Sequence, residues 1–159
     1  MPPSHDVTFK VEHGSLSEPT KALLAQQMQL RHSDMQLPLP FVADFTPYLD
    51  PKMTVHTLWF DHDLACVGAL KLLDDGETGE LKTFRTQDRH LRKGAATTLL
   101  KHITKQSRTQ GLSRLSLETG TMPRLYPAVE LYKKLGFTVG EPFAAYTYRG
   151  DNQFLHLVL

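Results

Sequence analysis

The hydrophobic pattern of the chain changes period at Gly94, and this change constrains the fold more than any other feature. Before it, the segment 80–86 alternates apolar and polar residues as a half-buried strand does. After it, apolar residues recur at steps of three and four, the period of an amphipathic helix over 94–110: Ala96, Leu99, Leu100 and Ile103. Gly111 then supplies a helix C-cap. The fold must therefore lead a strand through a small residue into a helix.

The rest of the chain continues this alternation. Strand patterns cover 7–13, 55–60, 64–73, 80–86, 115–118, 137–139 and 153–159, and helix patterns cover 17–31, 94–110 and 127–135. Asp61-His62-Asp63 is a predicted hairpin turn. Between 37 and 52, four prolines favour a packed loop that buries its apolar residues and includes a short helical turn. The order β-α-β-β-β-α-β-α-β-β predicts an α/β (α+β) fold, a mixed sheet flanked by helices in one domain over 1–159.

Composition excludes several classes of protein. A chain of 159 residues, 40% hydrophobic and 22% charged, fits a globular domain that needs no disulfide or structural metal. A net charge of +1 argues against nucleic-acid and membrane partners. Cys66, the single cysteine, lies in an apolar run, so we expect a small buried side chain and a reducing compartment. The N-terminal Met1–Asp6 lacks a signal-peptide pattern and no apolar run approaches ~20 residues, which predicts a cytoplasmic protein.

The start of the helix predicted over 94–110 is a candidate phosphate site. Helix N-termini offer unpaired backbone N–H groups and a partial positive charge, and small residues let a phosphate approach the main chain. The small residues are Gly94, Ala95 and Ala96, and the nearby cations are Arg89, Arg92 and Lys93. The same residues also suit tight packing of a helix on a sheet beside a solvated basic loop, so this pattern alone leaves both interpretations open.

Two segments in this part of the chain resemble the GNAT superfamily of acetyl-CoA-dependent N-acetyltransferases. The run 91–96, LRKGAA, is similar to motif A of the family, Q/R-x-x-G-x-G/A, with Leu91 where glutamine or arginine is usual. The run 128–137, AVELYKKLGF, is similar to the downstream signature A-I-x-L-Y-x-x-x-G-F. The resemblance extends from about Leu58 to the C-terminus through 79–82, 117–120 and 142–146, whereas residues 1–57 match only in element order.

The resemblance implies a single GNAT-type domain with a mixed, mostly antiparallel sheet, and transfer of an acetyl group from acetyl-CoA to a primary amine without a metal. It implies that the backbone of Phe84, Arg85 and Thr86 holds the pantetheine arm of coenzyme A. It further implies that the diphosphate lies at the helix start, on Leu91, Arg92, Lys93, Gly94, Ala95, Ala96 and Thr97. The eight histidines are scattered without an H-E-x-x-H pattern, so the sequence predicts no metal site.

Catalysis requires an acceptor ammonium, with a pKa of about 10.4 for a lysine-like amine, to lose a proton before it attacks a thioester. Glu80 is the candidate base, because it lies eleven residues before Leu91, as the base glutamate does in related members. Glu80 is equally interpretable as a strand-end carboxylate or as a partner of Lys82 or Arg85. Glu118 is an alternative base or a contact for the acceptor ammonium.

Tyr132 matches the family tyrosine whose hydroxyl lies near the thioester sulfur, where it can protonate the departing thiolate. Its alternative interpretation is an amphipathic residue that packs its ring on the helix face and leaves its hydroxyl in water.

Two other functions stay open at this point. Leu91, together with Leu125 in place of a frequent asparagine, fits a non-catalytic GNAT-like domain that binds acyl-CoA or a protein. A local basic cluster at Lys82, Arg85, Arg89, Arg92 and Lys93 fits nucleic-acid binding, against which the near-neutral overall charge argues. The acceptor, the range of acyl groups and the oligomeric state are not specified by the sequence, although many relatives form homodimers.

Overall fold

The computed structural model describes residues 6–159, so most of the N-terminal segment predicted to lack a signal peptide lies outside the described residues. The chain forms two compact units, one made of the residues up to Ala69 with Thr83–Leu99, the other of Leu70–Lys82 with Leu100–Leu159.

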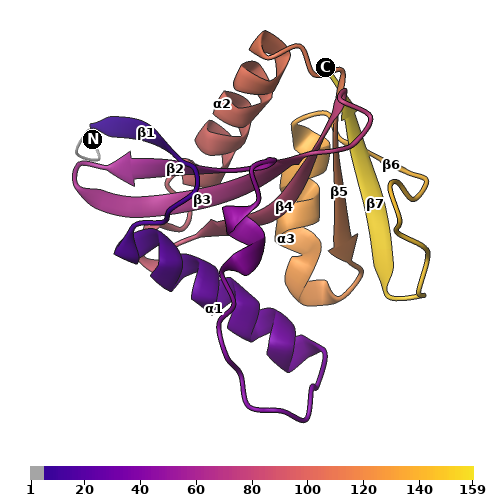
Figure 1. Cartoon of the computed structure of the whole chain (residues 1–159), viewed down its shortest axis with the longest axis horizontal. Helices are drawn as coiled ribbons and strands as arrows, with labels where there is room; N and C mark the ends of the chain where they lie inside the picture. The colour runs from indigo at the N-terminus through magenta and orange to yellow at the C-terminus, as the bar shows by residue number, and fades with distance from the viewer. Residues whose placement is uncertain (1–5) are drawn as a thin grey trace. The chain divides into compact units, whose positions relative to one another are not determined.

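The helices and strands follow one another along the chain in this order: β1 Val7–Glu12, α1 Glu18–Asp34, η1 Thr46–Leu49, β2 Met53–Phe60, β3 Asp63–Leu72, β4 Thr78–Thr86, η2 Asp88–His90, α2 Ala95–Thr109, β5 Arg114–Gly120, η3 Pro123–Leu125, α3 Tyr126–Lys134, β6 Thr138–Gly140 and β7 Asn152–Val158 (Figure 1). The predicted order of helices and strands is confirmed.

Strand neighbours run β1-β2-β3-β4 in the first unit and β3-β4-β5-β7-β6 in the second, because β3 and β4 contribute residues to both. β1 pairs with β2 antiparallel, β4 with β5 parallel, and β7 with both β5 and β6 antiparallel. The predicted mixed, mostly antiparallel sheet is confirmed. Within the described residues, no helix combines the length and the apolar character needed to cross a bilayer.

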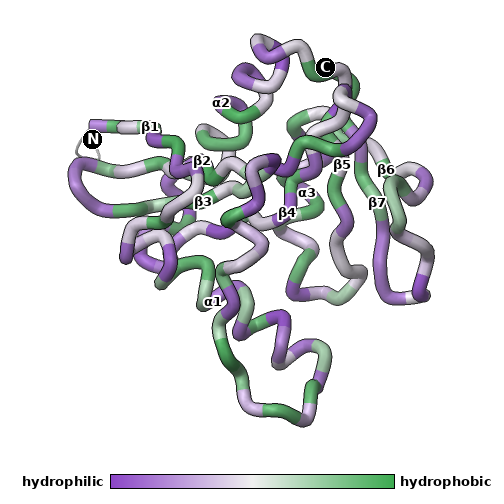
Figure 2. The backbone as a smooth tube through the Cα atoms, in the orientation of Figure 1, coloured by the Kyte–Doolittle hydropathy of each residue, from purple (hydrophilic) through white to green (hydrophobic). Residues whose placement is uncertain are grey.

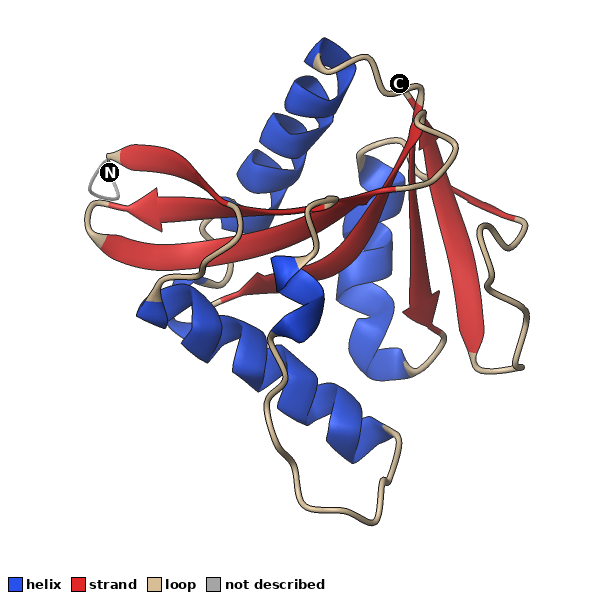
Figure 3. Ribbon diagram, viewed as in Figure 1, coloured by secondary structure: helices blue, strands red, loops and turns tan. Residues whose placement is uncertain are grey.

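Helix α1 supplies much of the core of the first unit. Pro19 lies in its first turn, where a missing N–H costs no hydrogen bond. Leu23 and Leu24 are fully buried and belong to one apolar cluster with Trp59 of β2 and Val67 of β3. Figure 3 shows the helix running along these strands. The buried face of α1 therefore fixes the helix against β2 and β3.

Strand β1 is less buried than its alternating pattern predicts. Val7, Phe9 and Val11 are 45%, 37% and 57% exposed, so the prediction of a half-buried strand is wrong in this respect. The alternation identifies a strand, but burial requires a second layer over the apolar side chains, and local sequence carries no information on that layer.

The loop after α1 differs from the prediction in the same way. The expected short helical turn is present as η1, which buries Tyr48. Leu37, Leu39 and Val42 are exposed, although we expected this loop to bury its apolar residues. Figure 2 shows hydrophobic stretches along the loop between α1 and η1. The prolines prevent regular structure here, and the loop packs mainly through the residues at its C-terminal end, Phe45 and Tyr48.

The second unit is built around β5. A Cβ placed on Gly79 of β4 would lie 3.0–3.1 Å from the side chains of Leu70, Leu112 and Leu115, so glycine permits close packing at this point. The parallel ladder pairs Thr78 with Arg114 and Glu80 with Ser116. The segment Glu141–Asp151, called the β6–β7 loop below, connects the last two strands.

Candidate active site

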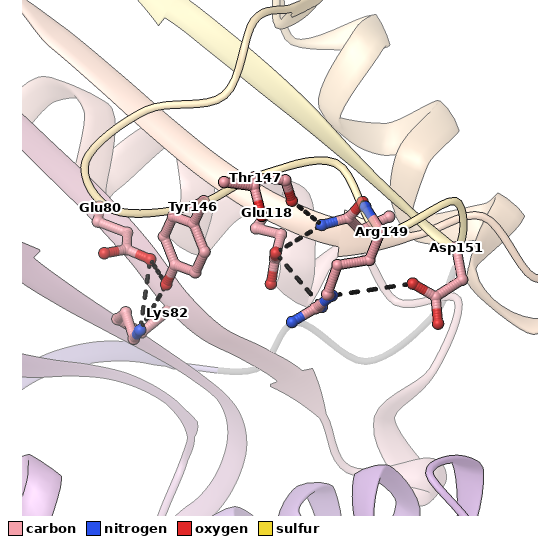
Figure 4. Close-up of polar contacts among 8 residues, drawn as sticks. Glu80, Lys82, Glu118, Tyr146, Thr147, Arg149 and Asp151 are labelled. Carbon is pink, nitrogen blue, oxygen red and sulfur yellow. Dashed lines mark hydrogen bonds and ion pairs between the residues drawn. The ribbon is translucent and has the colours of Figure 1, made fainter.

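Glu80 lies at the centre of a polar cluster in the second unit. It is only 4% exposed, although it is a carboxylate on a strand. Tyr146 of the β6–β7 loop donates a hydrogen bond of 2.5 Å from its hydroxyl to Glu80 Oε2. The Lys82 ammonium lies 3.4 Å from the same oxygen and donates to the Tyr146 hydroxyl at 2.8 Å (Figure 4). The predicted alternative in which Glu80 pairs with Lys82 is thus present.

The groups around Glu80 are held in defined protonation states. Partial burial disfavours the Lys82 ammonium, but its hydrogen bond to Tyr146 and the charge of Glu80 outweigh this effect and raise the pKa of Lys82 above its ordinary value. Burial, together with the hydrogen bond to Glu80, raises the pKa of Tyr146. Lys82 is therefore a cation and Tyr146 a neutral phenol at neutral pH, so both donate hydrogen bonds.

A pocket of about 550 Å³ opens beside this cluster and is lined by Glu80, Lys82 and Tyr146. Its other walls come from the end of β3, the turn after it, the start of β5 and the β6–β7 loop: Lys71, Leu73, Asp74, Asp75, Arg114, Ala144 and Ala145. This size suits a small molecule. The pocket therefore brings the predicted base to the edge of a cavity.

Glu118, the alternative base, has different surroundings. Its Oε2 accepts hydrogen bonds from Asn152 Nδ2 at 2.9 Å and from Arg149 at 3.4 Å. Asn152 also donates to the Thr147 carbonyl oxygen at 3.0 Å. Figure 4 shows Arg149 between Glu118 and Asp151. Glu118 therefore fastens the end of the β6–β7 loop to β5.

A third contact holds the start of the same loop. Ser116 pairs in register with Glu80 on one side and with His156 on the other. Its hydroxyl lies 2.7 Å from His156 Nδ1, and His156 Nε2 lies 2.8 Å from the Glu141 carbonyl oxygen. The β6–β7 loop is thus attached to three adjacent strands, and the aromatic ring of Phe143 packs on Tyr146 and His156 beneath it.

The predicted phosphate cradle lies in the first unit. Arg92 and Gly94 both have positive φ, +62° and +80°, so the chain turns sharply before α2. The backbone hydrogen bonds of the helix begin with the Thr98 N–H donating to the Gly94 carbonyl, and the N–H groups of the preceding turn have no partner within the helix. A Cβ on Gly94 would meet nothing within 4 Å, so the space above it is open.

Exposure within the cradle follows this geometry. Ala95 is buried and Ala96 and Thr97 are half-buried, whereas the residues before them are exposed: Leu91, Arg92, Lys93 and Gly94. The small side chains at the start of α2 are thus partly or fully buried, whereas Gly94 and the cations before it are exposed to solvent. This arrangement can receive an anion on backbone N–H groups.

Asp63 connects the cradle loop to the start of β3. Its two oxygens accept a bidentate pair of hydrogen bonds from Arg89 at 2.6 and 2.7 Å, and Oδ2 also lies 2.6 Å from His90 Nε2. These partners hold the pKa of the Asp63 carboxyl well below its usual range. Lys93 lies 3.4 Å from the other nitrogen of His90. The turn predicted at 61–63 is present, and its last residue also anchors the loop before α2.

The strand residues predicted to hold pantetheine are half-buried. Arg85 donates to Gln27 of α1 at 3.2 Å, and within residues 6–159 its buried Nε has no hydrogen-bond partner. Thr86 donates to Cys66 Sγ at 3.4 Å. Burial raises the pKa of the Cys66 thiol to about 12, so this cysteine is a protonated core residue, as predicted. Phe84 lies beside Arg85 on β4 and is also half-buried.

Tyr132, the predicted acid, lies in α3 and is 8% exposed. Its ring packs against Phe137, with centroids 5.7 Å apart, and the Phe137 N–H donates to the Tyr132 carbonyl. The ring packing of the alternative interpretation is thus present. No cluster of three metal-ligating side chains occurs in the part of the chain that the structure describes.

Sequence reasoning assigned no role to Tyr146 or Asp63. Tyr146 is 66 residues from Glu80, and Asp63 is 26 and 27 residues from its partners, so local patterns could not pair them. The resemblance includes Tyr146 within the run 142–146, and this was the one signal available for it.

The chain is similar to known proteins in sequence and, separately, in fold. The Acetyltransferase (GNAT) family profile matches residues 22–137. The chain is 37% identical over 152 residues, 95% of each chain, to the uncharacterized N-acetyltransferase YedL of Escherichia coli (strain K12). It resembles in fold the IAA acetyltransferase of Bacillus cereus ATCC 14579, with a TM-score of 0.70 and 17% identity over 97% of this chain and all of that one.

A Bacillus subtilis acetyltransferase solved in complex with CoA matches with a TM-score of 0.67 and 18% identity, covering 96% of this chain and 99% of that one. The two structural likenesses support the fold, and the family match together with the E. coli relative establishes the family. The chain belongs to the GNAT acetyltransferase family and is an acyltransferase.

Proposed function

We propose that this enzyme transfers the acetyl group of acetyl-CoA to the primary amine of a small acceptor, with Glu80 as the general base. One observation carries the proposal: within residues 6–159, the side-chain contacts of the buried Glu80 all reach Oε2, so Oε1 can accept a proton at the edge of the pocket. A buried carboxylate with one oxygen fixed is oriented for proton abstraction, directly or through one water.

Glu80 suits this role better than Glu118. Glu118 accepts hydrogen bonds from an arginine and from an asparagine that ties down the β6–β7 loop, and it is not among the residues that line the pocket. Glu118 therefore has a structural role in this proposal, as the anchor of the loop.

Acetyl-CoA is the proposed cosubstrate, with its diphosphate on the N–H groups that precede α2. The open space above Gly94 and the positive φ angles of Arg92 and Gly94 fit a phosphate that approaches the main chain closely. Leu91 contributes backbone rather than side chain, so its difference from the family motif is tolerated. The CoA-bound state of the B. subtilis relative supports this assignment. The backbone of 84–86 would hold the pantetheine arm.

The reaction follows from these roles. Glu80 Oε1 takes a proton from the acceptor ammonium, and the neutral amine nitrogen attacks the thioester carbonyl carbon. The C–N bond forms and the C–S bond breaks, and the departing thiolate takes a proton from the Tyr132 hydroxyl. The second proton that the attacking nitrogen loses as it becomes an amide restores that hydroxyl. The products are an N-acetylated amine, CoA thiol and the proton that leaves Glu80.

Two measurements on the purified chain test this proposal. Acetyl-CoA is expected to raise Tm in a thermal-shift assay, and CoA thiol is expected to be released when an amine from a panel of small acceptors is added. A Tm rise without thiol release from any amine would favour the non-catalytic acyl-CoA-binding domain. Neither effect, with a folded chain, would contradict both functions.

A further inference from the structure

A primary amine of the chain itself lies across the sheet from the proposed base. The Leu73 N–H donates to the Thr78 carbonyl oxygen at 2.9 Å, which sets the register where the β3–β4 hairpin closes. Two residues further along each strand, Lys71 therefore lies directly opposite Glu80. Side chains of directly opposite residues share a face of the sheet, with Cβ atoms about 4.5–5.5 Å apart. Both side chains line the pocket, so the Lys71 amine lies where an acceptor amine is expected.

Two lysines lie beside Glu80, and they are held differently. Lys82 lies 3.4 Å from Glu80 Oε2 and donates to the Tyr146 hydroxyl at 2.8 Å (Figure 4). These contacts keep Lys82 an ammonium, which has no lone pair for attack on a thioester. Lys71 is half-buried, and within residues 6–159 no hydrogen bond or ion pair holds it. Of these two lysines, Lys71 is therefore the one that can act as a nucleophile.

The Glu80 carboxylate has one oxygen available to the Lys71 amine. Tyr146 and Lys82 both contact Oε2, and no side chain in the described part of the chain contacts Oε1. A lysine carries its ammonium on a flexible four-carbon stem, so the nitrogen can move within the pocket. A proton can thus pass from Lys71 to Glu80 Oε1 directly or through one water.

We propose that Lys71 is itself a substrate: when no other amine fills the pocket, the enzyme acetylates its own Lys71 side chain with bound acetyl-CoA. Glu80 Oε1 takes one proton from the Lys71 ammonium, and the nitrogen lone pair attacks the thioester carbonyl carbon. The N–C bond forms, the C–S bond breaks, and the second proton lost by the nitrogen balances the one taken up by the thiolate. The products are acetylated Lys71, CoA thiol and the proton that leaves Glu80. The proposal rests on the proposed function, since it uses the same base and cosubstrate.

Mass spectrometry of the purified chain incubated with acetyl-CoA alone tests the proposal. Acetylation of Lys71 is expected to be about a hundredfold faster than that of Lys82 or of Lys101, an exposed lysine of α2 that serves as the control. This ratio is the lower end of what a general base contributes. The fraction acetylated per unit time should not depend on protein concentration, because amine and base belong to one chain. Acetylation of Lys101 as fast as that of Lys71 would overturn the proposal.

Substitution of the base adds the second arm. Glu80→Gln is expected to slow acetylation of Lys71 by about a hundredfold and to leave the slow chemical acetylation of Lys101 unchanged. Lys71→Arg keeps the positive charge and should remove the modification from the pocket. Equal rates at Lys71 in wild type and in a folded Glu80→Gln variant would show that the reaction is uncatalysed and would overturn the proposal.

An arm without substitutions separates this proposal from the proposed function. A small amine that the enzyme acetylates should slow modification of Lys71, because both amines use the same pocket and base. Release of CoA thiol with such an amine while Lys71 stays unmodified, with and without the amine, would overturn the proposal and leave the proposed function standing. Acetylation of Lys71 that depends on Glu80, with no amine of the panel accepted, would support the proposal and contradict transfer to a small acceptor.

Discussion

The Tyr146 hydroxyl and Glu80 Oε2 are joined by a 2.5 Å hydrogen bond that links the β6–β7 loop to β4. Tyr146→Phe removes this bond but keeps the ring that packs on Phe143 at 5.1 Å. We expect kcat to fall by about tenfold, the value of one hydrogen bond to a charged group, because Oε2 is no longer fixed. The KM for acetyl-CoA should not change. Steady-state kinetics with both substrates varied checks this, and an unaltered kcat would show that the bond only fastens the loop.

The same cluster predicts a loss of stability at high pH. The folded-state pKa values of Lys82 and Tyr146 both lie above their ordinary values near 10, so the folded chain holds these protons more tightly than the unfolded chain. Their contribution is complete below the unfolded pKa values and is lost as the pH rises through the folded ones. Tm should therefore fall more steeply above pH 10 in wild type than in a Lys82→Met/Tyr146→Phe variant. Plots of Tm against pH with the same slope in both proteins would contradict a contribution of these two protons to stability.

Glu80→Gln and Glu118→Gln distinguish the two candidate bases. We expect Glu80→Gln to lower kcat by about 10²–10⁴-fold, the usual effect of losing a general base, without weakening acetyl-CoA binding. Glu118→Gln should lower Tm, because Asn152 and Arg149 lose their charged partner, and should change kcat much less. Steady-state kinetics and thermal melts of both variants test these two expectations. The reverse order of the kcat losses would make Glu118 the base.

Gly94→Glu is expected to abolish acetyl-CoA binding, because it places bulk and negative charge where the diphosphate would lie. Gly94→Ala separates charge from backbone strain, since both changes force a side chain at a φ of +80° but only glutamate repels phosphate. Gly14→Glu is the matched control, with a φ of +78° and equally open surroundings between β1 and α1. Calorimetric titration of acetyl-CoA gives the affinities. An unchanged affinity of Gly94→Glu for acetyl-CoA would show that the diphosphate does not bind at the residues before α2.

Asp63→Asn should weaken both stability and cofactor binding. Asp63 is half-exposed, so solvent screens its ion pairs and the expected cost is about 1 kcal/mol, a few degrees in Tm. The depressed pKa of Asp63 gives stabilisation that is complete above the unfolded value near 4 and is lost as the pH falls toward the folded value.

Wild type should therefore begin to lose its advantage over Asp63→Asn between pH 5 and pH 3, and should lose more of it at lower pH. The KM for acetyl-CoA should rise because Arg89 and His90 no longer hold the loop before α2. Asp88→Asn, an exposed neighbour 3.8 Å from Arg85, is the control. An Asp63→Asn variant with wild-type melts at both pH values and an unchanged KM would show that Asp63 does not hold this loop.

The sequence predicted the elements well because each depends on local periodicity and caps. The helix predicted over 94–110 is α2 at Ala95–Thr109, and the strand predicted over 153–159 is β7 at Asn152–Val158. Exposure was predicted less well: Phe9 and Leu39 face solvent, because burial depends on which segments fold over a residue.

In the candidate site, too, some residues could be predicted from local sequence and others could not. Glu80 and the cradle lie in segments that carry family motifs, so their positions followed from the sequence. The partners that orient them, Tyr146 and Asp63, are joined by contacts between residues far apart in the chain, and no local pattern specifies such contacts.

The three attachments of the β6–β7 loop, to Glu80, Glu118 and His156, have a consequence for how such enzymes diversify. Residues 142–145 lie between the attachment points at Glu141 and Tyr146, so mutations there can reshape the acceptor wall while the fasteners stay in place. Evolution could thereby change the amine that is accepted without altering the residues proposed to bind acetyl-CoA, provided that Tyr146 and Asn152 are retained.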